Sequence, residues 1–199
     1  MNTKPKRKVQ NEVRYYFFDG LNYISESRRF IFIVIAVFLF FGLFAFIIPG
    51  PFKILDPILR GLVDKTEGLN IGQMIVFILN NNLQSAVLGF VLGIFFGIFP
   101  FVNGIVNGSV LGYVFSRLYS VSGFSEFWRI LPHGIFELPA IFISLGLGVR
   151  LGASFFSGKD ITNNLRERFV RGGRAFVLVV IPLLVIAAVI EGLLIGLTK

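Results

Sequence analysis

Two side chains that could do acid–base chemistry lie four residues apart in the otherwise apolar stretch 131–140. They are His133, which is the only histidine of the chain, and Glu137. On an α-helix they would lie about 40° apart around the axis and one turn apart along it, so both would face the same neighbour. Because an ionisable group at membrane depth is costly and needs a partner, the pair predicts a functional polar contact within a membrane.

The composition indicates the class of chain that holds this pair. Of 199 residues, 55% are hydrophobic, 25 are phenylalanine and only 15% are charged, whereas a soluble domain carries about 25% charged residues. That much apolar surface suits a lipid environment, which only helices and closed barrels can span. We therefore expect an all-α, polytopic membrane helical bundle. The absence of cysteine excludes disulfides and thiolate metal sites.

Five apolar stretches are long enough to cross a bilayer as helices. The run 83–116 carries no charge and is too long for one crossing, so we divide it at a tight turn over 100–102, with a re-entrant hairpin as the alternative. The first span follows a long basic segment without a cleavage site and is expected to be a retained anchor. The predicted spans are residues 30–48, 80–99, 103–119, 132–151 and 175–197.

These spans form one transmembrane domain over 30–199, preceded by a basic cytoplasmic segment over 1–29. Amphipathic stretches outside the spans predict short helices in the plane of the membrane interface. The first covers 13–24, where a juxtamembrane linker is the alternative. Two more are expected at 52–63 and in the basic loop 152–174.

Both halves of the long apolar run carry a glycine at every fourth position, a spacing that lets helix backbones approach closely in lipid. These rows predict a glycine-zipper hairpin of the second and third spans, with a homodimer seam as the alternative. Asn103 and Asn107 flank the second row and are expected to form interhelical hydrogen bonds. The rows are Gly89, Gly93 and Gly97 in the second span, and Gly104, Gly108 and Gly112 in the third.

Two prolines lie inside predicted helices, where proline removes a backbone hydrogen bond and crowds a carbonyl. Pro139 follows Glu137 by two residues, and Pro182 lies in the fifth span. We expect a kink at each proline. The kink at Pro139 would free backbone polar groups beside the ionisable pair.

The distribution of lysine and arginine sets the expected orientation. With the N-terminus in the cytoplasm, thirteen of the 19 basic residues fall inside, as the positive-inside rule favours. The C-terminus would then lie outside the cell membrane. We assign the net charge of +8 to membrane contact rather than to nucleic acid, because no nucleic-acid motif is present. Anionic lipid headgroups are expected to contact Arg166, Arg168, Arg171 and Arg174.

This orientation brings polar residues from three segments to a similar depth in the outer leaflet. Asn81 and Asn82 open the second predicted span, His133 and Glu137 lie at the start of the fourth, and Glu191 lies near the end of the fifth. We expect these five residues to converge on one polar pocket or network that faces the outside.

The same segments resemble the stage II sporulation protein M family over roughly residues 28–198. The resemblance implies a multi-pass inner-membrane protein. In spore-forming bacteria it implies an anchor for a peptidoglycan-degrading complex that drives engulfment, although the family also occurs where no spores are made. It rests on Asn81-Asn82, on the glycine rows, and above all on Pro132-His133-Gly134 followed by Glu137-Leu138-Pro139.

Three functions are compatible with these observations. A membrane scaffold or anchor for a partner complex is favoured, because the resemblance supports it and no complete catalytic set is present. The alternative is a proton- or ion-coupled small-solute transporter that uses His133, Glu137 and Glu191 as a relay. The minor alternative, an intramembrane metal-dependent hydrolase, would use the same three residues as ligands and leave no general base.

We accordingly expect no enzymatic activity, no cofactor and no metal. The expected partners are the lipid bilayer, an unknown protein, and a second copy of the chain in a homodimer or higher oligomer.

Overall fold

The computed structural model describes residues 4–123, 127–158 and 160–197, with their side chains except those of 4–11, 13, 127–133, 196 and 197. Every regular element in this part of the chain is helical. Five helices are long and apolar enough to cross a membrane, which confirms the expected all-α class and number of spans. They cover Arg28–Ile47, Ile71–Ile94, Ile98–Ser122, Gly134–Phe156 and Ile161–Ile195.

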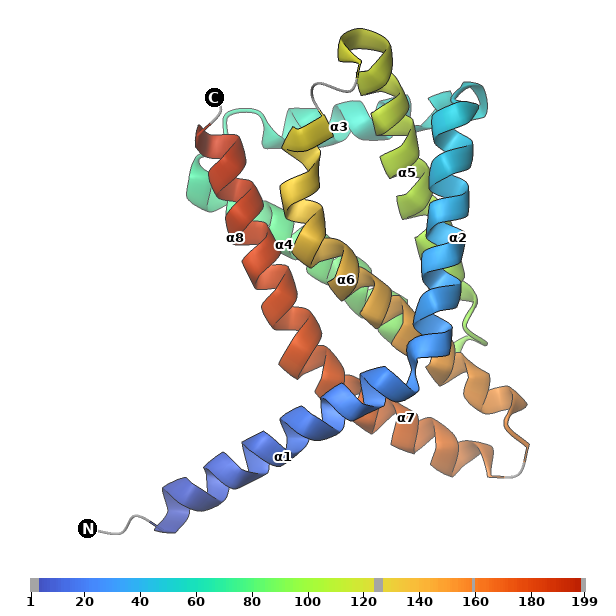
Figure 1. Cartoon of the computed structure of the whole chain (residues 1–199), viewed down its shortest axis with the longest axis vertical. Coiled ribbons are helices and arrows are strands. Elements are labelled where there is room, and N and C mark those ends of the chain that lie inside the picture. Colours follow the sequence, from blue (N-terminus) through green and yellow to red (C-terminus); the bar gives the residue numbers. More distant parts are fainter. Residues whose placement is uncertain (1–3, 124–126, 159, 198–199) are drawn as a thin grey trace.

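The chain begins with two helices that meet at a bend. The amphipathic helix α1 (Lys4–Glu26) is longer than the predicted interfacial helix, and α2 (Arg28–Ile47) forms the first span. Ser27 is buried between them, and its hydroxyl donates to the Tyr23 carbonyl at 2.6 Å. As Figure 1 shows, α1 leaves the end of α2 at an angle and runs outward from the bundle.

A surface helix connects the first span to the second, as predicted. It consists of a short 3-10 turn, η1 (Gly50–Leu55), and α3 (Asp56–Thr66). Pro51 and Pro57 lie in the first turns of these two helices, where a missing N–H costs nothing. In Figure 1, α3 lies across the end of the bundle opposite α1, near the C-terminus.

The second span begins earlier than predicted. Helix α4 runs over Ile71–Val91 and is followed by a 3-10 turn, η2 (Leu92–Ile94). Its start is fixed by a capping box in which Gln73 N–H donates to the Asn70 side chain at 2.9 Å and Asn70 N–H donates to the Gln73 side chain at 3.0 Å. Asn80, Asn81 and Asn82 therefore lie in the middle of a helix rather than at its start.

The turn between the second and third spans also differs from the prediction. Helix α5 (Ile98–Ser122) begins just after Phe96 and Gly97, which adopt positive φ angles of 57° and 74°. Pro100 was expected in the turn. It instead lies buried in the first turn of α5, where its missing N–H again costs nothing.

The fourth span, α6 (Phe127–Gly152), lies at the centre of the bundle and packs against α2, α4, α5 and α8. Its second half is almost completely buried. Gly146 approaches the Ile31 backbone of α2, and Gly148 approaches the Gly89 carbonyl of α4 so closely that a Cβ atom would overlap it. The helix continues through Pro139, which is exposed on its surface.

The two glycine rows pack against different helices. In η2, at the end of the second span, Gly93 approaches the Gly148 backbone of α6, whereas on α5, Gly108 and Gly112 approach the carbonyls of Phe38 and Gly42 on α2. The rows are therefore used within one chain. Each row contacts a helix outside the α4–α5 pair, because α5 packs mainly on α2, and α4 packs on both α6 and α8.

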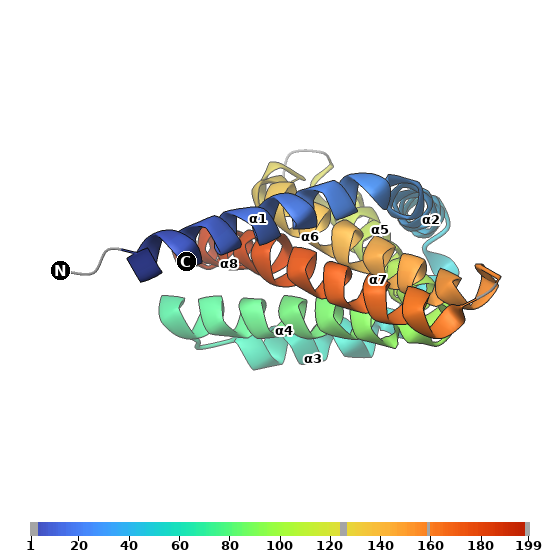
Figure 2. The same ribbon diagram turned by 90° about the horizontal axis from the view of Figure 1, so that it is seen from below.

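The last membrane-spanning segment is interrupted near its middle. Helix α7 (Ile161–Ala175) passes into a π-helical turn, η4 (Phe176–Val180), and then into α8 (Ile181–Leu197). Pro182 follows the π-helical turn. A π-helical turn within a helix is an established cause of helix bending. The kink was predicted at Pro182 itself, whereas the irregular backbone of this segment lies just before that residue, at Phe176–Val180. Figure 2 shows α7 alongside α1.

We expect Gly112→Ala to destabilise the protein by about 1–3 kcal/mol, because its Cβ would meet the Gly42 carbonyl within a packed helix interface. The measurement is the thermal unfolding midpoint in detergent. Gly61→Ala is the matched control, since nothing lies within 4 Å of a Cβ at Gly61 in helix α3. Equal midpoints for the two variants would contradict the close approach of α2 and α5.

Candidate functional site

One polar contact between spans joins Asn82 on α4 to Glu137 on α6. The two side chains hydrogen-bond, Asn82 being buried and Glu137 half-buried. An ionised carboxylate only accepts hydrogen bonds, so the Asn82 amide supplies the donor. The contact gives an intramembrane carboxylate the partner that its depth requires.

A second contact holds the same two helices in register. The Ser144 hydroxyl donates to the Ala86 carbonyl at 2.7 Å, and both residues are fully buried. Ser144 follows Glu137 on α6 as Ala86 follows Asn82 on α4, so the two helices run parallel. This hydrogen bond and the close approach at Gly93 fix which residues of α4 can face Glu137.

Helix α8 brings a second carboxylate to this place. Its Gly192 packs directly on Ile75 of α4, with Ala188, Met74 and Ile78 forming a buried apolar contact beside it. Glu191 is half-buried and lies close enough to Glu137 for their charges to interact. We call Asn82, Glu137 and Glu191 the polar junction of α4, α6 and α8.

The other two residues predicted for this cluster are placed differently. Asn81 is exposed, and its amide donates to Asn82 Oδ1 at 3.4 Å. His133 lies in α6 one turn before Glu137, and its side chain is outside the described residues. Within the described part of the chain, no group of three His, Cys, Asp or Glu residues could hold a metal ion.

Both asparagines of α5 were expected to form interhelical hydrogen bonds, and one of them does. Asn103 Nδ2 donates to the Ser85 hydroxyl of α4 at 3.0 Å, which is an interhelical hydrogen bond. Asn107 Nδ2 donates to the Asn103 carbonyl at 3.0 Å and therefore bonds within its own helix.

The end of α5 nearest α3 carries a polar contact that the sequence did not reveal. The Tyr113 hydroxyl donates to Asp56 Oδ1 at 2.7 Å, and Arg117 Nη2 pairs with Asp56 Oδ2 at 3.0 Å. The Tyr113 hydrogen bond, together with Arg117, holds the pKa of the Asp56 carboxyl below its usual value. This contact ties the surface helix α3 to the third span.

A second unpredicted cluster lies at the opposite end and joins α1, α6 and α7. The guanidinium groups of Arg150 and Arg171 lie over the Tyr23 ring, 4.0 and 4.7 Å from its centroid. Tyr23 is only 1% exposed, and this burial raises its pKa to about 12 although the nearby arginines oppose the shift. The ring thus remains neutral and acts as a cation–π platform.

Ion pairs complete this cluster. Arg171 pairs with Asp19 at 3.2 Å and with Glu26 at 3.0 Å, while Arg150 pairs with Glu26 at 2.9 Å. The hydrogen bond from Arg171 lowers the pKa of the Glu26 carboxyl. Asp19 and Glu26 lie seven residues apart on one face of α1, a spacing that could have predicted an acidic stripe facing a basic helix.

Three of the four arginines that are expected to contact lipid headgroups also have partners within the protein. Arg171 and Arg174 pair with carboxylates of α1, and Arg168 Nη1 donates to the Arg150 carbonyl at 2.7 Å. Only Arg166 is left exposed without a described partner. The carboxylates of α1 offer these arginines charge-assisted hydrogen bonds at close range. Contact of the four arginines with lipid headgroups stays a prediction.

The five apolar helices and their polar contacts define a multi-pass α-helical membrane protein. The family model of stage II sporulation protein M matches residues 30–194. This match covers most of the chain, which therefore belongs to that family and confirms the resemblance. Comparisons with curated proteins and with solved structures found no match.

We expect Asn82→Leu to destabilise the protein by about 1–3 kcal/mol, because Glu137 would lose its hydrogen-bond donor while remaining in the bundle. Asn81→Leu is the control, since Asn81 is the exposed neighbour on the same helix. Thermal unfolding in detergent compares the two. If Asn82→Leu were as stable as Asn81→Leu, the contact with Glu137 would have no structural role.

Proposed function

We propose that this protein is a membrane scaffold that anchors a partner complex, with its N-terminus in the cytoplasm and its C-terminus outside the cell membrane. In a spore-forming bacterium the anchored complex would be the cell-wall-degrading engulfment machinery. The partner would bind the loops outside the bilayer or the basic cytoplasmic face, and the protein itself would carry out no catalysis.

The observation that supports a scaffold is that polar side chains between the spans form hydrogen bonds from one helix to another. Asn82 hydrogen-bonds Glu137, Ser144 hydrogen-bonds the α4 backbone, and Asn103 hydrogen-bonds Ser85. Each contact joins two helices, and close glycine packing lies beside them. Polar side chains arranged in this way fix helix packing in lipid.

The orientation rests on the arrangement of the basic residues. Helices α1 and α7 lie at one end of the bundle, and α3 and the C-terminus lie at the other (Figure 1). Most lysines and arginines are at the α1–α7 end. The positive-inside rule assigns that end to the cytoplasm.

A second copy of the chain is a further partner that we infer. The glycine rows are occupied by contacts within the chain, so a dimer would use another surface. Helix α2 has an exposed apolar face that includes Phe32, Phe40 and Leu43. That face is also the place where lipid would contact the helix.

Coupled transport is the second candidate function. It is favoured by the proximity of Glu137 and Glu191, two titratable groups on different spans. The π-helical turn before Pro182 offers a point at which α8 could move relative to α7. In this case the polar junction would bind a proton or cation during transport.

Proton flux into sealed liposomes under an imposed pH gradient distinguishes the two functions. A scaffold predicts no flux above that of empty liposomes for the wild type, His133→Ala or Glu137→Gln. Flux that is lost in Glu137→Gln and Glu191→Gln would contradict the scaffold, provided that it is retained in Glu67→Gln. Glu67 serves as the control because it is an exposed carboxylate outside the spans.

A further inference from the structure

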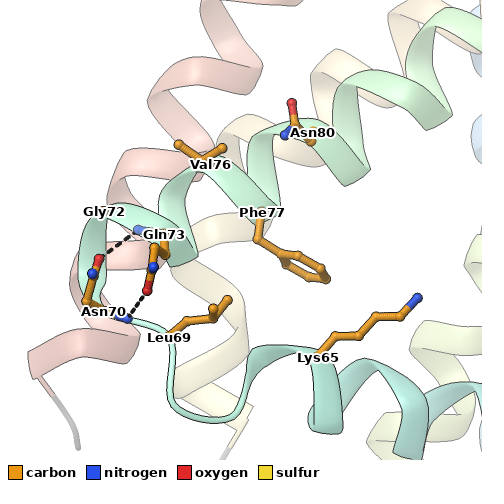
Figure 3. Close-up of a pocket in the computed structure, with 8 residues that line it drawn as sticks. All are labelled: Lys65, Leu69, Asn70, Gly72, Gln73, Val76, Phe77 and Asn80. Carbon is orange, nitrogen blue, oxygen red and sulfur yellow. Dashed lines mark hydrogen bonds between the residues drawn. The ribbon is translucent and has the colours of Figure 1, made fainter.

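A crevice of about 610 Å³ lies where the surface helix α3 passes over the beginning of α4. Lys65 comes from the end of α3, Leu69 and the N-cap residue Asn70 from the connection, and the remaining residues from the first half of α4 (Figure 3). The volume lies within the range of small-ligand sites, about 300–1,000 Å³. The lining residues are Lys65, Leu69, Asn70, Gly72, Gln73, Val76, Phe77 and Asn80.

The lining carries one positive charge and no negative charge. Lys65 extends from the end of α3 below the Phe77 ring, with its amino group pointing away from Leu69 and the capping box, as Figure 3 shows, and it forms no ion pair with any described residue. Asn70 and Gln73 bond each other in the capping box, so they shape the entrance without offering a free charge. The crevice thus presents a single ammonium group together with three apolar side chains, Leu69, Val76 and Phe77, and three amide side chains.

The position of the crevice relative to the bilayer limits what can enter it. Helix α4 begins a membrane span at Ile71, so we expect the crevice at its start to lie at the level where headgroups meet acyl chains. Val76 is 56% exposed on α4 and would face lipid. A lysine at the end of a span places its ammonium group at the interface, where lipid phosphates lie.

We propose that this crevice binds one anionic phospholipid from the leaflet on the α3 side. The Lys65 ammonium pairs with the lipid phosphate, and an acyl chain follows Leu69, Val76 and Phe77 into the membrane. Charge complementarity at Lys65 and the apolar side chains of Leu69, Val76 and Phe77 favour a lipid over a free anion. The site is separate from the arginines near α1 and α7, which lie at the other end of the bundle (Figure 1).

The test uses the full-length protein in liposomes that contain phosphatidylglycerol with a photoactivatable acyl chain. After illumination, mass spectrometry maps the labelled peptides. We expect labelling within residues 69–80, and about fivefold less of it in Lys65→Gln, because one interfacial lysine is lost. Lys65→Arg should retain the labelling. Lys53→Gln is the matched control, since Lys53 is an exposed lysine of η1 that does not line the crevice.

Three results would overturn the proposal. The first is equal labelling in Lys65→Gln and Lys53→Gln. The second is equal labelling by a photoactivatable phosphatidylcholine with the same chain, which would show that charge plays no part. The third is loss of labelling when inorganic phosphate is added, which would assign the site to a free anion.

Discussion

The close approach of backbones along α6 is the constraint on which the rest of the structure depends. Lipid is as apolar as the side chains of the spans, so helices in a bilayer associate through packing and hydrogen bonds rather than through the hydrophobic effect. Gly146 and Gly148 remove side chains at the places where α6 meets α2 and α4. With these contacts in place, α6 is the helix around which the other spans are arranged.

The same packing explains where polar groups can be tolerated. Once α4 and α6 run parallel at backbone distance, Asn82 and Glu137 lie within hydrogen-bonding reach, and α8 brings Glu191 beside them. At the two ends of the bundle, charged contacts attach the surface helices. Asp56 connects α3 to α5, and Glu26 connects α1 to Arg150 and Arg171. The bundle is thus held by glycine packing within the membrane and by ion pairs at its borders.

The length and apolarity of the uncharged sequence stretches were sufficient to predict five spans, because the thickness of a bilayer sets the length of a spanning helix. The ends of α4 were not predictable from apolarity, since its first turns include Asn70 and Gln73, whose capping role depends on local geometry. The sequence indicated that Glu137 and Glu191 lie at a similar depth. Whether the two side chains face each other depends on how α8 packs on α4, which the sequence does not reveal. The contact of Tyr23 with Arg150 joins residues 127 positions apart, and no local pattern could reveal it.

The central claim is that the polar junction holds packed helices together and excludes water. The natural chain has no cysteine, so single cysteines can test this claim directly with a membrane-impermeant thiol reagent in sealed liposomes. Ile78→Cys and Ala140→Cys would place thiols in buried positions of α4 and α6 near the junction. Ile54→Cys, at a position of η1 that is 78% exposed and outside the spans, is the reactive control. We predict that the thiols at 78 and 140 resist modification from both sides while the thiol at 54 reacts. Rapid modification at 78 or 140 would contradict this account, because it would show that water reaches the junction.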